Sequence, residues 1–209
     1  MKTNGFAPDT VIDIGAYKGE WTKDVRGVFP QAHFLMVEPQ LQMRERLESM
    51  AGRSPHIAYA NELLAAEQGK EVTFYIHGSV SSVLEKPESG DEAEKHVTTT
   101  LDQFLEETSF PDPNLIKLDV QGYELEVMRG ASSLLDRSPP EAMILETSLI
   151  DCIGGAPLFL DVCQFMDERG YRVYDFCTFY RRPLDGALWQ VDTVFVHENS
   201  ELVATNQYQ

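Results

Sequence analysis

The chain has 209 residues and a formal net charge of −17 at pH 7. A chain of this length can bury a sizeable core, and we expect one domain over residues 1–209. A nucleic-acid-binding surface needs clustered lysine and arginine, and Arg181-Arg182 is the only basic pair, so nucleic acid and anionic membranes are disfavoured as partners. No apolar run is long enough to span a bilayer, and Met1–Thr10 lacks the apolar segment of a secretory signal.

Apolar runs alternate with helical patterns along most of the chain, which is typical of a mostly parallel α/β sheet covered by helices on both faces. We expect strands at residues 11–14, 33–38, 56–60, 115–120, 141–146, 171–176 and 191–197. We expect helices at residues 18–28, 40–50, 101–107, 123–135 and 158–169.

The first strand leads into the turn Asp13-Ile14-Gly15-Ala16-Tyr17-Lys18-Gly19. Glycines here let the backbone approach a ligand closely, and the free N–H groups of the following helix favour an anion. The spacing Gly-x-x-x-Gly differs from the Gly-x-Gly-x-x-Gly of nicotinamide and flavin binders. We therefore predict that Asp13, Gly15, Ala16, Tyr17 and Gly19 belong to a cofactor site; for Asp13 the alternative is an acid that only caps the turn.

The second strand ends in Glu38-Pro39, and Glu38 follows Gly15 by 23 residues. An ionised carboxylate at this place can accept hydrogen bonds from two ribose hydroxyls. The alternative is a solvated acid at a strand end.

The segment 71–99 interrupts the alternation of strands and helices. It begins with a strand pattern that places Val72, Phe74 and Ile76 on one face, continues through polar residues with Pro87 and Gly90, and ends in a second short strand. We expect a small antiparallel insertion with a mobile loop. The loop is either a lid over the active site or a solvated surface loop, and surface loops are commoner.

The segment Ile116–Ala131, with the sequence IKLDVQGYELEVMRGA, resembles the signature of the FkbM family of methyltransferases. That signature has an apolar strand, Asp, an apolar residue, Glu, Gly, a variable residue and Glu, followed by an amphipathic helix that ends in Gly-Ala. Gln121 departs from it, because Glu is usual at that position. The segment Asp13–Gly19 resembles the first glycine motif of S-adenosylmethionine-dependent methyltransferases. Three further segments resemble elements of the FkbM family: the serine-rich Ser81–Leu84, Thr100–Asp102 and Leu145-Glu146.

This resemblance implies a Rossmann-like methyltransferase fold, with seven strands of which the last is antiparallel. It implies that the cofactor is S-adenosylmethionine. It also implies that the reaction transfers a methyl group, usually to an oxygen atom of a sugar, glycolipid or secondary metabolite. It also assigns Asn61, which follows the third strand, to the adenine side of the cofactor site. It assigns Ser82 as a further cofactor contact, although a simple serine-rich turn is nearly as good an interpretation.

Asp119 and Glu146 end the fourth and fifth strands, at the edge where open α/β sheets bind ligands. We predict both as catalytic residues. Asp119 either orients the methionine part of the cofactor, accepts the proton of the acceptor, or ligates a metal; Glu146 is the next candidate base. Mg²⁺ held by Asp119 with Glu146 or Glu124 is a minority alternative, because no strong metal-ligand spacing occurs and we assign no metal residues.

Three cysteines, Cys152, Cys163 and Cys177, are odd in number and lack metal-type spacing, which favours reduced thiols in a cytoplasmic protein. The acceptor pocket is expected from residues 77–97 together with the loops after the fourth and fifth strands, and a second subunit of a homo-oligomer is a further possible source. Two other functions remain open: a catalytically inactive module that binds S-adenosylmethionine, and a nicotinamide-dependent oxidoreductase. The glycine spacing and the lack of a Tyr-x-x-x-Lys pair argue against the oxidoreductase.

Overall fold

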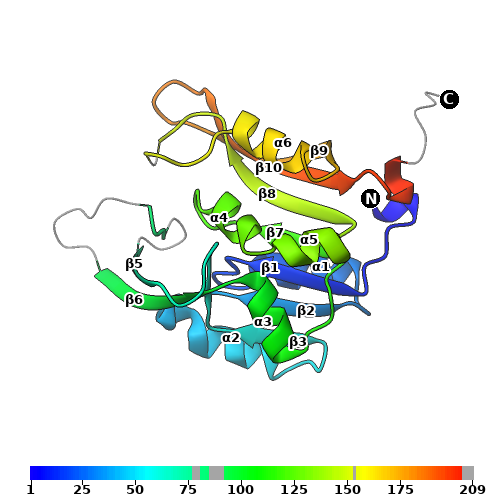
Figure 1. The fold of residues 1–209 in the computed structure, drawn as a ribbon, viewed down its shortest axis with the longest axis vertical. Coiled ribbons are helices and arrows are strands. Elements are labelled where there is room, and N and C mark those ends of the chain that lie inside the picture. The colour runs from blue at the N-terminus through cyan, green and yellow to red at the C-terminus, as the bar shows by residue number, and fades with distance from the viewer. Residues whose placement is uncertain (77–80, 85–91, 153, 204–209) are drawn as a thin grey trace.

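The computed structural model describes residues 1–76, 81–84, 92–152 and 154–203 (Figure 1). In this part of the chain, seven strands form the main sheet in the order β3-β2-β1-β7-β8-β10-β9. Neighbouring strands are parallel except for β10, which is antiparallel to both β8 and β9. The predicted seven-stranded sheet with an antiparallel last strand is therefore confirmed. The strands are β1 (Thr10–Ile14), β2 (His33–Val37), β3 (Ile57–Ala60), β7 (Leu115–Leu118), β8 (Ala142–Ser148), β9 (Tyr171–Arg181) and β10 (Leu188–His197).

Helices cover both faces of this sheet, as predicted. The alternation of side chains along a strand places Ile12 and Ile14 of β1 toward one group of helices and Val11 toward the other. The first face packs against α3 (Leu101–Thr108), α4 (Glu124–Arg129), α5 (Ser132–Arg137) and α6 (Phe159–Asp167), and the second against α1 (Glu20–Val28) and α2 (Arg44–Ala51). Short 3-10 helices lie at Lys2–Asn4, Leu41–Met43 and Glu201–Val203.

The longest described helices, α1 and α6, have nine residues each. No helix in the described part of the chain has the length and hydropathy needed to cross a membrane.

The single helix predicted at residues 123–135 is wrong, because the chain breaks between α4 and α5 at Gly130-Ala131. Gly130 packs so closely that a Cβ atom there would lie 2.1 Å from the carbonyl oxygen of Ala65. The carboxylate of Asp102 then accepts hydrogen bonds from the backbone N–H groups of Ser133 and Leu134, both at 2.8 Å. Asp102 therefore caps α5 from a distant part of the chain.

The last two strands are longer than predicted. β9 continues to Arg181 and β10 begins at Leu188, so the two strands form a hairpin that reaches past the rest of the sheet (Figure 1, top). The turn between them holds an ion pair between Arg182 and Asp185, at 2.5 Å. The outer part of β9 is mostly exposed, so it lacks the buried apolar pattern on which the prediction relied.

The predicted β-insertion is confirmed as a second, three-stranded sheet with the order β4-β6-β5. β5 (Glu71–Ile76) and β6 (Glu92–Thr99) are antiparallel, whereas β4 (Leu63–Leu64), which was not predicted, pairs parallel with β6. The residues on which the mobile-loop prediction mainly rests, 77–80 and 85–91, lie outside the described residues.

Candidate functional site

The glycine turn after β1 brings the ends of β1, β2 and β7 together. Gly15 has φ +79°, and its N–H donates to the carbonyl oxygen of Val37 at 2.9 Å. A Cβ atom on Gly15 would lie 1.9 Å from the carbonyl oxygen of Asp119. The turn therefore needs glycine both for its backbone conformation and for its contact with the chain after β7.

Glu38 is held under this turn with both carboxylate oxygens engaged. Its Oε2 accepts the N–H of Tyr17 at 2.8 Å, and its Oε1 accepts the N–H of Gln40 at 3.0 Å. The side chain is 3% exposed, so the alternative of a solvated strand-end acid is wrong. Burial raises the pKa of Glu38 to about 7, although the two backbone hydrogen bonds act in the opposite direction. Each oxygen keeps a second lone pair that can accept from a ligand hydroxyl.

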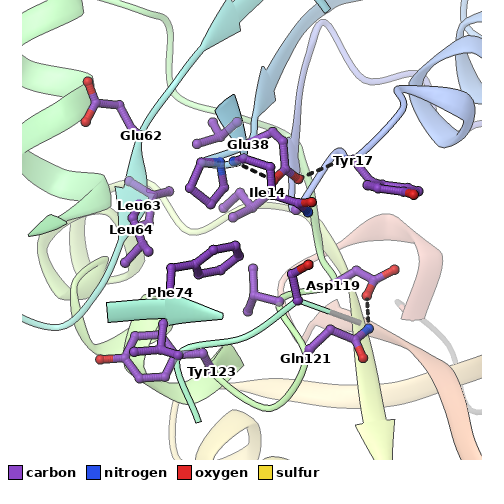
Figure 2. A pocket seen from close by; sticks show the side chains of 17 residues that line it. Ile14, Tyr17, Glu38, Glu62, Leu63, Leu64, Phe74, Asp119, Gln121 and Tyr123 are labelled. Atoms are coloured by element: carbon purple, nitrogen blue, oxygen red, sulfur yellow. Dashed lines mark hydrogen bonds between the residues drawn. The ribbon is translucent and has the colours of Figure 1, made fainter. Parts of the chain in front are cut away.

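A cavity, here called the central cavity, lies between this turn and the small sheet. Figure 2 shows Leu63, Leu64 and Phe74 on one side of it, with Glu38 and Asp119 on the other side. The lining residues are Ile14, Gly15, Tyr17, Val37, Glu38, Pro39, Gln40, Glu62, Leu63, Leu64, Phe74, Ser81, Val83, Asp119, Val120, Gln121 and Tyr123.

Asp119 follows β7 and is held from both sides. Its Oδ2 lies 3.0 Å from Nζ of Lys117, and its Oδ1 accepts from Nε2 of Gln121 at 2.8 Å. The Lys117 side chain is buried; burial lowers its pKa, but the charges of Asp119 and Asp13 outweigh that effect and raise the pKa overall. Lys117 is therefore a permanent cation beside Asp119, whose own side chain is 31% exposed.

Gln121 also connects Asp119 to Glu146. The same Nε2 atom donates to Oε2 of Glu146 at 2.9 Å, and Gln190 donates to that oxygen at 3.1 Å. Burial, together with the negative charges of Asp119 and Glu124, raises the pKa of Glu146 well above its ordinary value. A glutamate at position 121 would add a third carboxylate here, whereas the amide of Gln121 supplies a donor to both acids.

Glu124 secures the loop that carries Asp119. Its Oε1 accepts the N–H groups of Val120 and Gly122, at 3.1 and 3.2 Å. The side chain is buried, and burial raises its pKa to about 7. Glu124 thus contacts the backbone on both sides of Gln121.

The residues predicted for the cofactor site and for catalysis fall into three groups in the structure. Gly15, Tyr17, Glu38, Pro39 and Asp119 line the central cavity. Asp13 and Ala16 line an adjoining cavity that also contains Asp119. Gly19, Asn61, Ser82 and Glu146 line neither of these two cavities.

Residues of that third group support their neighbours instead. Asn61 Nδ2 donates to the carbonyl oxygens of Glu38 and Pro39, at 2.9 and 2.8 Å. Ser82 Oγ donates to the carbonyl oxygen of Gln121 at 2.9 Å. Gly19 packs against Met50, whose side chain would lie 2.8 Å from an added Cβ atom.

The sequence interpretation missed the apolar wall of the central cavity and missed Lys117. Leu63, Leu64 and Phe74 reach the cavity only because the small sheet folds against the main one, and no local pattern records that. Lys117 had a usable signal: it precedes Asp119 by two residues in a buried strand, and residues two apart share one face of a strand.

No metal site is present among the residues that the structure describes, where no three His, Cys, Asp or Glu side chains gather in a suitable group. The Mg²⁺ alternative stays an untested prediction.

Comparisons with known proteins agree with this geometry. The model of the family described as "Methyltransferase FkbM domain" matches residues 13–173. The comparison with curated proteins found no match.

Solved structures with the same fold include three methyltransferases. Magnesium protoporphyrin IX methyltransferase from Synechocystis PCC 6803, with bound S-adenosylmethionine, has a TM-score of 0.54 and 11% identity, over 94% of this chain and 73% of that chain. Precorrin-6y C5,15-methyltransferase from Geobacter metallireducens GS-15 has a TM-score of 0.52 and 14% identity, over 93% of this chain and 83% of that chain. The N-methyltransferase NodS from Bradyrhizobium japonicum WM9, in complex with S-adenosylhomocysteine, has a TM-score of 0.51 and 11% identity, over 91% of this chain and 79% of that chain.

Proposed function

Because this chain belongs to the FkbM family of S-adenosylmethionine-dependent methyltransferases, we propose that it methylates a hydroxyl oxygen of a sugar, glycolipid or secondary metabolite. The observation that carries this proposal is the place of Asp119. This partly exposed carboxylate lies beside a permanent cation, at the edge of the cavity that fits the cofactor. A partly exposed carboxylate at this place can accept the proton of a hydroxyl group.

The central cavity suits the adenosine part of the cofactor. Leu63, Leu64 and Phe74 offer an apolar wall for the adenine, and the remaining lone pairs of Glu38 suit the ribose hydroxyls. Gly15 lets the backbone approach the ligand at the turn. The part of the cavity near Tyr17 and Asp119 is then left for the methionine end.

Bound S-adenosylmethionine supplies a methyl group that its sulfonium already activates, so the protein's task is alignment and proton removal. The acceptor oxygen forms its bond to the methyl carbon as the carbon–sulfur bond breaks, and the hydroxyl proton passes to the carboxylate of Asp119. Lys117 and Gln121 hold that carboxylate in place. Glu146 is the weaker candidate base, because its raised pKa favours the protonated form near neutral pH.

The test identifies the atom that is methylated. Methyl-labelled S-adenosylmethionine is incubated with a panel of sugars, glycolipids and hydroxylated secondary metabolites, and each labelled product is analysed by mass spectrometry and NMR. We expect a methyl ether, recognised by the chemical shift of its O–CH₃ group. Label attached to nitrogen or carbon in every product would contradict the proposal while leaving the methyltransferase assignment intact.

A further inference from the structure

A second cavity opens on the other side of Asp119, between the start of α1 and the β9–β10 hairpin. We call it the hairpin cavity. It shares Gly15, Tyr17 and Asp119 with the central cavity, so the two cavities meet at these residues. Figure 2 shows the Tyr17 ring and the Asp119 carboxylate on the side of the central cavity opposite Leu63 and Leu64.

We propose that the hairpin cavity holds the methyl acceptor and selects a neutral or cationic acceptor that donates hydrogen bonds, against an anionic one. This inference rests on the proposed function, because it places the acceptor relative to the cofactor in the central cavity. It differs from the sequence-based expectation, which sought the acceptor pocket mainly in residues 77–97 and the loops after β7 and β8.

Asp13, one of the residues that line this cavity, has a buried oxygen without a hydrogen-bond partner in the described part of the chain. Asp13 lines the cavity and is 0% exposed. Its Oδ2 accepts the hydroxyl of Thr22 at 2.7 Å, whereas its Oδ1 has no hydrogen-bond partner among the described residues. Because a buried polar atom without a hydrogen-bond partner is costly, an O–H or N–H group bound in the cavity would stabilise it.

The charges around the cavity are predominantly negative. Five acidic side chains, those of Asp13, Glu20, Asp24, Asp119 and Asp192, line it together with two lysines, and burial raises the pKa of Asp13 and Asp192. Nζ of Lys117 is already engaged by Asp119 at 3.0 Å, and Nζ of Lys18 lies 4.8 Å from the centre of the Tyr17 ring. A phosphate or carboxylate on the acceptor would therefore meet more acidic than basic side chains, whereas hydroxyl or amine groups would find hydrogen-bond acceptors.

Aromatic side chains complete the walls. Tyr17 and Trp21 lie on the α1 side and Tyr180 on the hairpin side, and all three line the cavity. Their faces suit the C–H surface of a ring or a cationic group. Tyr180 and Asp192 line only the hairpin cavity, so changes to them separate acceptor binding from cofactor binding.

The test measures the charge of the labelled product and its dependence on the hairpin. A small-molecule cell extract is incubated with methyl-labelled S-adenosylmethionine and wild-type protein, or with Tyr180→Ala or Asp192→Lys, and is then separated by ion exchange. Phe179→Ala and Asp175→Lys are the controls, since both residues lie on β9 outside the two cavities. Calorimetric titration with S-adenosylhomocysteine measures cofactor binding in every variant.

We expect the label in neutral or cationic products, and a loss of about tenfold or more in Tyr180→Ala and Asp192→Lys with unchanged S-adenosylhomocysteine affinity. The controls should match wild type. Anionic products, or labelling that is indifferent to both hairpin variants, would overturn the inference and leave the proposed function standing. Wild-type protein that binds S-adenosylhomocysteine but transfers no label to any fraction would contradict both.

Discussion

At the scale of single residues, the site depends on contacts that permit very little change. Gly15 touches the backbone after β7, and Glu38 takes two backbone N–H groups under the same turn. The residues of the turn therefore shape the central cavity as well as line it. Substitutions there should change stability and cofactor affinity together.

Gly15→Ala should destabilise the protein strongly. The new Cβ would lie 1.9 Å from the carbonyl oxygen of Asp119, and φ at this position is +79°. Gly69→Ala is a matched control, since Gly69 has φ +78° and a Cβ atom there would have nothing within 4 Å. In urea denaturation we expect a loss of about 1–2 kcal/mol for Gly69→Ala, and about 1–3 kcal/mol more for Gly15→Ala. Equal losses in the two variants would show that the close approach is unimportant.

Glu38→Ala should weaken the binding of S-adenosylhomocysteine. The loss of hydrogen bonds to a charged group costs about 1.5–3 kcal/mol, which corresponds to roughly 10- to 150-fold in Kd. In wild-type protein the affinity should rise between pH 6 and pH 8, because the pKa of Glu38 is about 7 and the ionised carboxylate is the better acceptor. Calorimetry across this range measures both effects. A folded Glu38→Ala variant with wild-type affinity would refute the ribose assignment.

At the scale of elements, local sequence patterns predicted most strands and helices. They did not predict features that depend on contacts between segments far apart in the sequence. The apolar runs of β1, β2, β7 and β8 are buried on both faces, so their pattern is strong. The break between α4 and α5 depends on Ala65 and Asp102, which lie far away in the sequence. The apolar wall of the central cavity and the hairpin cavity likewise arise only from the packing of separate elements.

Asp102→Ala should destabilise α5, because it removes the acceptor of the N–H groups of Ser133 and Leu134. Losses of helix caps typically cost about 0.5–2 kcal/mol. Asp136→Ala, an exposed change on α5 itself, is the control and should stay within about 0.5 kcal/mol of wild type. The measurement is the midpoint of urea denaturation for each variant. Equal midpoints for the two variants would contradict the capping role of Asp102.

At the scale of the whole molecule, several buried acids make stability depend on pH. Burial raises the pKa of Glu38 and Glu124 to about 7 and raises that of Glu146 further. The folded state therefore binds more protons than the unfolded state above pH 4.5, so the free energy of unfolding falls as the pH rises.

We expect the Tm of the ligand-free protein to decrease from about pH 5 to about pH 8.5. Glu146→Gln, which keeps the shape and removes the ionisable group, should flatten this decrease, whereas the exposed change Glu168→Gln should not. Calorimetric scans at several pH values provide the measurement. A Tm that rises over this range would contradict the direction of the shifts.

The central claim is that Asp119 removes the acceptor proton during methyl transfer. It is tested most directly by single-turnover methyl transfer in Asp119→Asn, with S-adenosylmethionine saturating and S-adenosylhomocysteine affinity measured in parallel. We predict that the rate falls by about 10²–10⁴-fold, the usual contribution of a general base, while the fold and the affinity are retained. A folded Asp119→Asn variant that transfers the methyl group at the wild-type rate would contradict the claim.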